Sequence, residues 1–543
     1  MESIAGNLAE MQRTPLREDH VARLREAGRE CSYPAGTIVA EAGDPQDRFI
    51  YVLEGTIDVL DPFTRQTFLP SNIGAAQFMG DIGLLAGGVF NLPYRATTAV
   101  RTIEVERETM LALMRELPEM SDIVITVLAA RVRRLFESAG ASLALLGRDE
   151  DAAIMAVARF ADRNRIPFRL LDPDSDEARE IARKTGTPEG AAAAFWGDHA
   201  IPDPDPHAVA EKLGLALPVG PAETFDVLIV GGGPAGVAAA VYAGAEGLTA
   251  LVVEDAAIGG QAGTSSRIEN YLGFPTGISG GDLVWRGQVQ AMKFGTRFAL
   301  PARAMEIERR NDGTFCVTLD RGQKVCVRAV VVASGVQYRR LPIPRLADLE
   351  GVGVYYAATD MEARFCEGTE VAIIGGGNSA GQAAMYLSRR ASHVHLLVRG
   401  KSLAASMSAY LTSRLESNPA VTIHYEVQCR ELVGEHRLEG VNITTPAGTE
   451  ALPVRALFIM VGAAPNTDWL GDCIALDDKG FVRTGREVGG ISAYAASCPG
   501  VFAVGDVRAG SVKRVASAVG EGSVAISEVW KWVHRDDAPA QDD

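Results

Sequence analysis

The chain has 543 residues, of which 47% are hydrophobic and 22% are charged. This composition is typical of a folded multidomain protein and excludes a largely disordered or fibrous chain. The formal net charge of −16, without a Lys/Arg cluster, argues against nucleic-acid binding. No run of about 18 apolar residues predicts a membrane span, and residues 1–18 lack the apolar core of a secretory signal. The seven cysteines form no CxxC, so we expect neither a disulfide scaffold nor a metal site. We expect the protein to be cytoplasmic, because disulfides are rare in that compartment.

The first segment, residues 1–138, has short runs in which apolar and polar residues alternate. Such alternation predicts strands with one face on a core. The runs are residues 37–40, 49–53, 56–60 and 97–105. From residue 121 to 137 the apolar spacing becomes helical. The segment is therefore predicted to be a small β-barrel followed by a helix.

The middle segment, residues 140–218, is predicted to have the element order β-α-β-α-β-β-α. The strands are expected at 142–146, 168–171, 191–196 and 199–201, and the helices at 151–164, 175–184 and 206–213. This order resembles the thioredoxin or glutaredoxin fold. The resemblance implies a CxxC after the first strand, where residues 147–150 have no cysteine, and a cis-proline loop at Thr187-Pro188. We expect a spacer or docking module without redox activity.

The third segment, residues 224–535, is α/β and contains a GxGxxG run at residues 231–236. The run follows a continuous apolar strand at 225–230 and precedes a helix at 237–246. Gly231 permits a tight turn, Gly233 lets the backbone approach a pyrophosphate, and Gly236 lets helix and strand pack closely. The next strand ends at Glu254, whose carboxylate can accept hydrogen bonds from ribose hydroxyls. These features together predict a dinucleotide site.

A second run of this kind, residues 375–380, follows an apolar strand at 371–374. The next strand, 394–398, ends at Arg399, and Lys401 lies close by. A cation in this place attracts a 2′-phosphate, so this site is predicted to prefer NADPH to NADH. The alternative is that Arg399 is only a solvated surface charge.

Residues 224–535 resemble the low-molecular-weight thioredoxin reductase family. The motifs that carry the resemblance are GGQ at 259–261, IENYLGFP at 268–275, ASG at 333–335, GAAPNT at 462–467 and GVFAVGD at 500–506. The resemblance implies a three-layer ββα fold, with an FAD domain at 224–338 and 468–535 and an NADPH domain at 339–467. It also implies a homodimer, and it places Asp506 on the ribityl chain of the flavin.

The resemblance and the fingerprints together give a set of expected cofactor contacts. For FAD these are Gly231, Gly233, Pro234, Ala235, Gly236, Glu254, Gly260, Gln261, Asn270, Ser334, Gly335, Gly505, Asp506, Arg514 and Val515. For NADPH they are Gly375, Gly377, Asn378, Ser379, Ala380, Arg399, Lys401 and Gly462. No metal ligands are expected.

One departure from the family concerns its redox CxxC, which lies in a tract that reads YCATC. Here residues 356–360 read YAATD, so Ala357 and Asp360 occupy the cysteine positions. Neither can act as a thiolate. Cys366 follows alone and is expected to be a packed residue, as is Cys498. Cys316 and Cys326 fall on adjacent predicted strands and could pair, although packing is favoured.

A second departure lies before the last helix, where the family's RQA reads Lys513-Arg514-Val515. Arg514 would lie near the pyrimidine edge of the flavin and raise its potential, or would pair with a carboxylate. Trp530, Trp532 and His534 could cover a flavin at a dimer contact, but their spacing favours packing.

The first segment resembles the cyclic-nucleotide-binding domain family. A YVLEGTIDV hairpin at 51–59 and Gly43-Asp44 match its pattern, and residues 79–85 with 94–98 match its phosphate cassette. The resemblance implies that Asp81 binds a ribose hydroxyl, Arg95 the cyclic phosphate, and Gly80 and Ile82 the same phosphate through N–H groups. Ala96 suits cAMP over cGMP. Asp81 is shorter than the family's Glu, and more residues than usual separate it from Arg95.

The chain is thus expected to be an NADPH-dependent FAD oxidoreductase of the thioredoxin reductase type, with hydride transfer from NADPH to the flavin and cAMP as a candidate effector. Without the CxxC, electrons would leave the flavin directly for a small redox protein, a quinone or oxygen. Two alternatives stay open: a disulfide reductase that uses other cysteines, and a non-catalytic flavin or nucleotide sensor.

Overall fold

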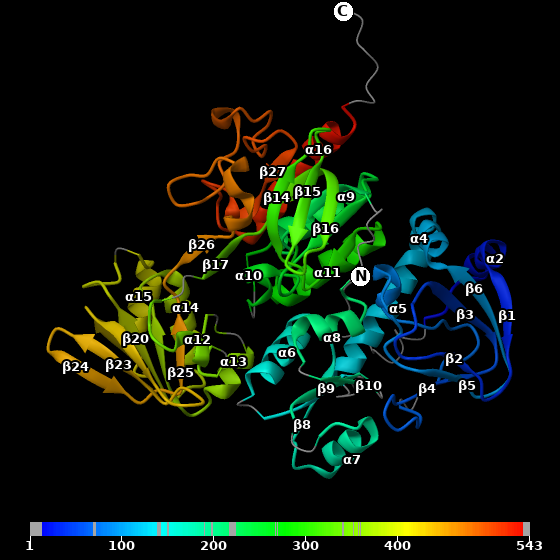
Figure 1. Cartoon of the computed structure of the whole chain (residues 1–543), viewed down its shortest axis with the longest axis horizontal. Helices are drawn as coiled ribbons and strands as arrows, with labels where there is room; N and C mark the ends of the chain where they lie inside the picture. Colours follow the sequence, from blue (N-terminus) through cyan, green and yellow to red (C-terminus); the bar gives the residue numbers. More distant parts are fainter. Residues whose placement is uncertain are drawn as a thin grey trace, which may run out of the picture.

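The computed structural model describes residues 14–535, apart from 69–71, 138–142, 149–150, 189–190, 197–198, 203, 217–223, 266–267, 269, 339–340, 351, 357, 359 and 405. The chain forms four structural units, of which the fourth is inserted between two segments of the third (Figure 1). The N-terminal unit and the middle unit lie below and beside the α/β unit that begins at residue 224.

The N-terminal unit is built from two antiparallel three-stranded sheets, in the orders β1-β6-β3 and β2-β5-β4. Its strands are β1 (Arg29–Tyr33), β2 (Ile38–Ala40), β3 (Arg48–Glu54), β4 (Ile57–Val59), β5 (Tyr94–Ala96) and β6 (Val100–Glu106). Its helices are α2 (Glu18–Ala27), α3 (Gly83–Ala86), α4 (Arg107–Glu116) and α5 (Pro118–Glu137). On β3, Ile50 and Val52 face the barrel core, whereas Phe49 and Tyr51 pack toward the helices. The alternation along this strand therefore divides the unit into a barrel and a helical layer, as predicted.

The middle unit has the predicted element order. It consists of β7 (Leu143–Leu146), α6 (Ala152–Arg163), β8 (Phe168–Leu171), α7 (Asp176–Thr185), β9 (Ala193–Trp196), β10 (His199–Pro202) and α8 (Pro206–Lys212). The sheet order is β10-β9-β7-β8, with β8 parallel and β9 antiparallel to β7. Asp151, Ser175 and Asp205 cap the three helices with their side chains. The cis proline expected at Thr187-Pro188 is wrong: among the described residues the cis bond is Leu300–Pro301, and trans is the lower-energy state.

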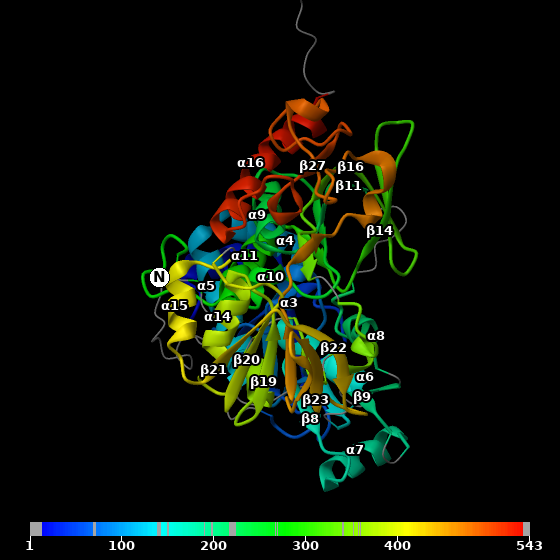
Figure 2. The ribbon, with the colours of Figure 1, turned by 90° about the vertical axis from the view of Figure 1, so that its left-hand side faces the viewer.

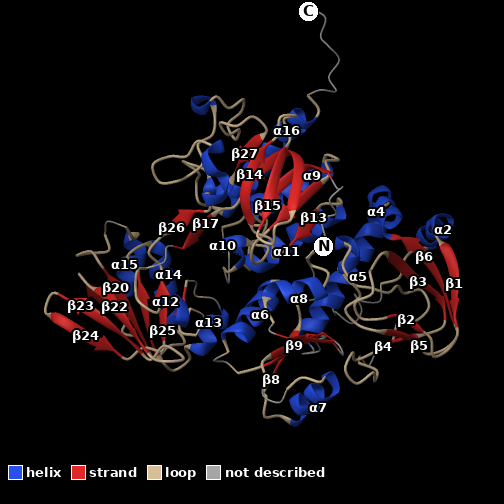
Figure 3. Ribbon diagram, viewed as in Figure 1, coloured by secondary structure: helices blue, strands red, loops and turns tan. Residues whose placement is uncertain are grey.

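The third unit, whose sheet is seen at the top of Figure 3, has the strand order β13-β12-β11-β16-β15-β14, with β27 also paired to β16. The parallel strands are β11 (Thr224–Val230), β12 (Ala250–Val253), β13 (Arg297–Ala299), β16 (Lys324–Val332) and β27 (Val501–Ala503). β14 (Ala304–Arg309) and β15 (Phe315–Leu319) extend β16 as an antiparallel meander. The helices are α9 (Pro234–Ala245), α10 (Gly260–Gly263), α11 (Gly280–Lys293) and α16 (Val515–Val533). α16 packs along α9 (Figure 2).

Helix α9 begins at Pro234, three residues before the predicted start. Proline suits the first turn of a helix, because its φ is already helical and its missing N–H would have no partner there. The helix N-terminus therefore lies directly after the glycine turn.

The fourth unit has a parallel sheet in the order β18-β25-β19-β20-β21 and an antiparallel meander, β22-β23-β24. The strands are β18 (Val354–Tyr355), β19 (Glu370–Ile374), β20 (His393–Val398), β21 (Val421–Tyr425), β22 (Gln428–Val433), β23 (Gly440–Thr445), β24 (Gly448–Leu452) and β25 (Ala456–Ile459). The helices are α12 (Leu346–Leu349), α13 (Asp360–Phe365), α14 (Asn378–Leu387) and α15 (Ala409–Glu416). The two-stranded pair β17 (Val336–Tyr338) and β26 (Ala463–Pro465) joins this unit to the third.

The N-terminal unit shares a continuous apolar core with the third unit. Leu84 and Leu85 of α3 belong to the same buried cluster as Val289 and Met292 of α11. Burial of this kind contributes about 25 cal/mol per Å² of apolar surface. The first and third units are therefore packed together rather than joined by a free linker.

Candidate functional site

The glycine turn after β11 is the centre of the first candidate site. Gly231 has φ +109°, and a Cβ there would lie 2.3 Å from the Ala333 carbonyl oxygen. A Cβ on Gly236 would lie 1.8 Å from the Gly231 oxygen. Gly233 differs, because a Cβ there would meet only the Gly260 Cα, at 3.9 Å. Gly231 and Gly236 are thus required by the protein itself, whereas the space beside Gly233, at the N-terminus of α9, fits a pyrophosphate.

Glu254 follows β12 and lies buried beneath this turn. Its Oε2 accepts from the Gly232 N–H at 2.7 Å, and its Oε1 accepts from the Ala256 N–H at 3.1 Å. Burial raises the pKa of the Glu254 carboxyl, Asp255 adds to this, and the two N–H donors oppose it. A carboxylate has about four acceptor positions, so Glu254 can hold the turn and still accept from a ribose hydroxyl.

Two other predicted contacts lie where the third and fourth units join. Gln261 on α10 donates to the Val336 carbonyl of β17 at 2.7 Å. Ser334 Oγ donates to the Asn466 carbonyl at 2.7 Å, and Asn466 Nδ2 donates back to the Ser334 carbonyl at 2.8 Å. Gly335 has open space where a Cβ would stand, and Asn270 is exposed. Gln261 and Ser334 therefore each bond to residues in or next to the β17–β26 pair, which joins the third and fourth units. The sequence did not indicate this role.

The carboxyl end of β27 carries a buried ion pair that sequence reasoning missed. Glu521 on α16 accepts from the Gly505 N–H at 2.7 Å, from Arg508 Nε and Nη2 at 3.2 and 2.7 Å, and from Ser511 Oγ at 3.0 Å. Asp506 directly follows Gly505, and burial raises the pKa of its carboxyl. No donor to its carboxylate is found among the described residues, so it is available to a hydroxyl-bearing ligand.

Arg514 is the residue before α16 and its side chain is exposed. Within the described part of the chain it makes no ion pair, so the carboxylate-pairing alternative gains no support. Val515 begins the helix beside it.

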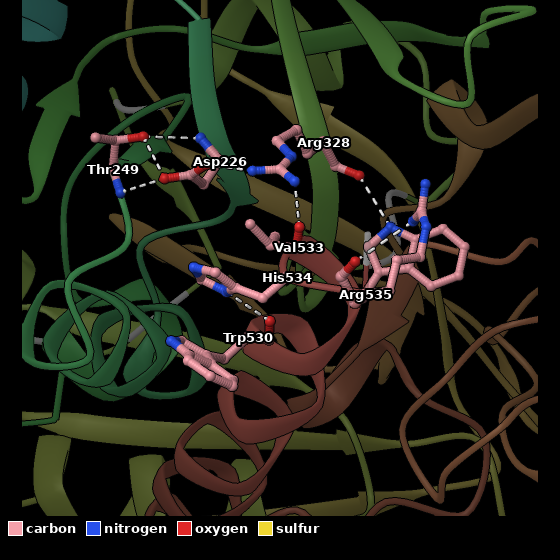
Figure 4. Close-up of polar contacts among 8 residues, drawn as sticks. Asp226, Thr249, Arg328, Trp530, Val533, His534 and Arg535 are labelled. Carbon is pink, nitrogen blue, oxygen red and sulfur yellow. Dashed lines mark hydrogen bonds and ion pairs between the residues drawn. The ribbon is translucent and has the colours of Figure 1, made fainter. Parts of the chain in front are cut away.

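The C-terminal aromatic residues lie at the other end of α16 (Figure 4). Trp532 Nε1 donates to the Arg328 carbonyl at 3.1 Å, and Arg328 donates to the Val533 carbonyl. The His534 ring stacks on the Trp530 ring, with 4.3 Å between the ring centroids. Arg328 lies level with the first residues of β11, whereas Gly231 follows the last, so this cluster lies toward the amino end of the parallel strands, away from the glycine turn. This position agrees with the expectation that Trp530, Trp532 and His534 have a packing role, since they lie far from the glycine turn of the same chain.

The second candidate site follows β19. A Cβ on Gly375 would lie 2.4 Å from the Met460 oxygen, whereas a Cβ on Gly377 would meet only the Ser406 oxygen, at 3.9 Å. Asn378 Oδ1 accepts from the Ser408 N–H at 2.8 Å. Ser379 is exposed at the N-terminus of α14, Ala380 is buried, and Gly462 has open space around its Cα. The turn again combines one glycine required by packing with one that borders free space.

Two cations were expected to choose between NADPH and NADH at this site. Arg399 is exposed and has no ion pair among the described residues, whereas Lys401 lies 3.7 Å from Glu426. Arg399 is therefore the freer of the two to meet a 2′-phosphate.

The tract where the family carries its cysteines leads into α13. Ala357 lies outside the described residues, as does the side chain of Asp360. Cys366 is buried, its thiol donates to the Glu362 carbonyl at 3.1 Å, and burial raises its pKa to about 12. A thiol in this state does not act as a nucleophile at neutral pH.

Helix α6 of the middle unit lies against this tract (Figure 1). Arg159 is partly buried, which lowers its pKa, and it faces Tyr355 and Glu362. Beyond the helix, Asn164 Nδ2 donates to the Ala256 carbonyl at 3.0 Å, and Arg165 pairs with Asp282. Helix α6 and the two residues that follow it thus contact both the third and the fourth units.

The third candidate site is the cassette of the N-terminal unit. Asp81 is buried, and its oxygens accept from the Gly83 N–H at 2.8 Å and Asn91 Nδ2 at 2.7 Å. Arg131 of α5 donates to the Gly80 carbonyl at 2.9 Å, a contact that sequence reasoning missed. Asp81 thus holds the cassette turn.

The other expected cassette residues lie on or beside α3 and β5. Arg95 is half-exposed on β5, opposite Asp58 of β4, next to the buried Ala96, and Ile82 precedes α3. The structure shows no contact between Asp81 and Arg95.

Helix α3 connects the cassette to the third unit. Arg107 caps its last carbonyls, donating to Leu84 at 2.7 Å and to Leu85 at 2.6 Å. The same helix packs against α11, which in turn packs against α9 and α10. The cassette is therefore connected to the first glycine turn through the packing of α3 on α11 and of α11 on α9.

Comparison with known proteins matches residues 225–522, more than half of the chain, to the family described as pyridine nucleotide-disulphide oxidoreductase. The chain belongs to this family. Residues 30–116 match the cyclic nucleotide-binding domain. The fusion and the oxidoreductase class expected from the sequence are thereby confirmed.

Several relatives match the oxidoreductase part. A thioredoxin reductase of Listeria monocytogenes is 33% identical over 57% of this chain and 94% of its own length. A 34.2 kDa protein in the rubredoxin operon of Clostridium pasteurianum is 31% identical over 57% of this chain and 97% of its own length. The crystal structure of Lactococcus lactis thioredoxin reductase (FR conformation) superposes with a TM-score of 0.52 at 26% identity, covering 57% of this chain and 99% of that one.

The chain is a thioredoxin reductase-like, NADPH-dependent flavin oxidoreductase, and its family implies FAD and NADPH as cofactors. The individual cofactor contacts, the homodimer, the cytoplasmic location and the thioredoxin-like nature of the middle unit stay predictions. None of the described helices is long and apolar enough to cross a membrane. The described residues contain no group of three or more metal-binding side chains.

Proposed function

We propose that the chain is an NADPH-dependent FAD oxidoreductase whose electrons leave for an acceptor without passing through a cysteine pair of its own. The acceptor would be a small redox protein, a quinone or oxygen. The observation that carries the proposal is the combination of two complete glycine turns with a tract in which Ala357 and Asp360 replace the family's cysteines.

The residues present fit the two cofactors. The space beside Gly233, the free acceptor positions of Glu254 and the unpartnered carboxylate of Asp506 would hold FAD, and Gly377 with Arg399 would hold NADPH. When bound, FAD supplies two-electron chemistry with NADPH as the hydride donor. The protein's part is to bind and orient, and the reaction needs no acid or base residue of the chain.

The disulfide-reductase alternative requires a reactive thiol near the flavin. Cys366 is buried, and burial raises the pKa of its thiol to about 12, which disfavours the thiolate. Cys316 and Cys326 face each other on β15 and β16, and Thr224, at the start of β11, is the partner of Cys326. This pair therefore lies at the amino end of the sheet, away from the glycine turn, which favours direct transfer from the flavin.

An anaerobic NADPH titration of the purified full-length protein tests the proposal. We expect about one NADPH per FAD to bleach the flavin absorbance, because the two electrons stay on the cofactor. The Cys366→Ser variant is the matched control and should give the same stoichiometry. A requirement for about two NADPH per FAD in the wild type, reduced to one by cysteine replacement, would contradict direct transfer.

We further propose that a cyclic nucleotide, cAMP in preference to cGMP, changes the activity by binding the cassette of the N-terminal unit. The supporting observation is the packing of α3, which follows Asp81, against α11 of the flavin-binding unit. A phosphate that binds the N–H groups of α3 would shift this helix. The shift would change the packing of Leu84 and Leu85 against Met292 of α11, in the core that the two units share.

Steady-state NADPH oxidation by the full chain, with a soluble quinone as acceptor, measures this coupling. We expect saturating cAMP to change kcat or KM by about fivefold or more. The Arg95→Ala variant should lose the response, because it lacks the cation for the cyclic phosphate. Binding of cAMP by calorimetry without any rate change would contradict the coupling, and absence of binding would contradict the effector.

A further inference from the structure

Two cysteines that are far apart in the sequence, Cys473 and Cys498, have neighbouring side chains in the third unit. Cys473 ends the 3₁₀ helix η1 (Asp468–Cys473), and Cys498 lies just before β27. Their Sγ atoms are 3.8 Å apart, and both thiols are free. A disulfide has an S–S bond of roughly 2 Å, so the two sulfurs are neighbours that must move closer for a bond to form.

The backbone holds the two segments together independently of the sulfurs. Ala475 N–H donates to Ser497 Oγ at 2.8 Å. The Val501 N–H donates to the Cys498 carbonyl at 3.0 Å, which fixes the turn into β27. The pair is therefore arranged in advance, so that closing it costs little further ordering of the chain.

The two thiols differ in access. Cys498 is 7% exposed, whereas Cys473 is half-buried. Burial raises the pKa of the Cys498 thiol to about 11, and Cys473 adds to this effect. An oxidant from solution would thus meet Cys473 first and Cys498 second.

We propose that Cys473 and Cys498 form a dithiol–disulfide couple, oxidised by a small-molecule disulfide such as oxidised glutathione. The Cys473 thiolate attacks one sulfur of the oxidant, and the first glutathione leaves as a thiol. Cys498 then loses its proton and attacks Cys473 Sγ, so that the second glutathione leaves. The protein gives up two hydrogens and two electrons, and the oxidant becomes two molecules of glutathione.

This couple is separate from the flavin chemistry. Cys498 precedes β27 and Gly505 follows it, so the cysteine pair and Asp506 lie at opposite ends of this strand. The closed loop nevertheless reaches the cofactor edge, since the Val482 N–H donates to the Val507 carbonyl at 3.0 Å and the Ala509 N–H to the Val482 carbonyl at 2.8 Å. Oxidation would therefore constrain a loop that supports the Asp506 turn.

The test is peptide mapping of the full-length protein by mass spectrometry after incubation with oxidised glutathione and alkylation of the remaining thiols. Trypsin cuts after Lys479, Arg483 and Arg486, so the two cysteines fall in separate peptides, 456–479 and 487–508. We expect these peptides to be linked, with the loss of two hydrogens, and to separate on reduction. Recovery of both peptides only as alkylated or glutathionylated monomers would overturn the proposal.

Variants make the result specific. Cys473→Ser should abolish the link and leave Cys498 alkylated only after unfolding, whereas Cys498→Ser should trap glutathione on Cys473. Cys316→Ser, a matched cysteine replacement in the same unit, should leave the 473–498 link unchanged. Because the readout is a peptide mass, it stands whether or not the proposed electron transfer is correct.

Discussion

Gly236→Ala should unfold the flavin-binding unit, while Gly233→Ala, three residues earlier, should leave it folded but unable to hold FAD tightly. A Cβ at 236 would stand 1.8 Å from the Gly231 oxygen, closer than any real contact, so α9 or β11 would have to move. We expect a loss of at least about 3 kcal/mol in the free energy of unfolding. Circular dichroism in urea measures this loss.

The Gly233→Ala variant keeps its fold because a new Cβ there meets only one atom within 4 Å, and the backbone (φ −70°) suits alanine. The unfolding free energy should change by less than about 1 kcal/mol. A Cβ in the space for the pyrophosphate should weaken FAD binding by about 10- to 100-fold. Flavin retained with normal affinity in Gly233→Ala would show that the pyrophosphate does not lie beside this residue.

Glu521→Ala should cost about 3 kcal/mol of stability, because it removes the carboxylate that pairs with the mostly buried Arg508 and leaves the buried Gly505 N–H without an acceptor. The Glu521 side chain is 8% exposed and that of Arg508 is 20% exposed, so little water replaces the lost carboxylate. FAD should also bind more weakly, since Glu521 holds the Gly505 N–H, and Gly505 directly precedes Asp506. The midpoint of urea unfolding and the flavin content after purification measure the two effects.

The matched control lies on the same helix. Glu528 pairs with Lys531, whose side chain is 65% exposed, so Glu528→Ala should cost less than about 1 kcal/mol. Equal losses in the two variants would show that α16 responds to any charge removal, and that the contacts of Glu521 are not special.

Patterns within a few residues determined much of this molecule. The apolar strand at 225–230 followed by Gly231 predicted a strand, turn and helix, and the structure has all three, since each depends on local dihedrals and burial. The predicted helix at 175–184 corresponds to α7, which begins after Ser175, because the Ser175 hydroxyl accepts from the Ala178 N–H in the first turn. The absence of cysteine at Ala357 and Asp360 was likewise plain in the sequence.

Contacts between distant segments could not be read in this way. No sequence motif singled out Glu521, whose carboxylate reaches Arg508 and Gly505 only in the folded chain. Cys473 and Cys498, 25 positions apart, gave no spacing signal, because the turn that joins them depends on β27 pairing with β16. The sequence by itself determined the two glycine turns, the cassette and the loss of the redox cysteines. Only the tertiary structure decided which buried charges and thiols meet, because packing between helices and sheets, and not local periodicity, sets those distances.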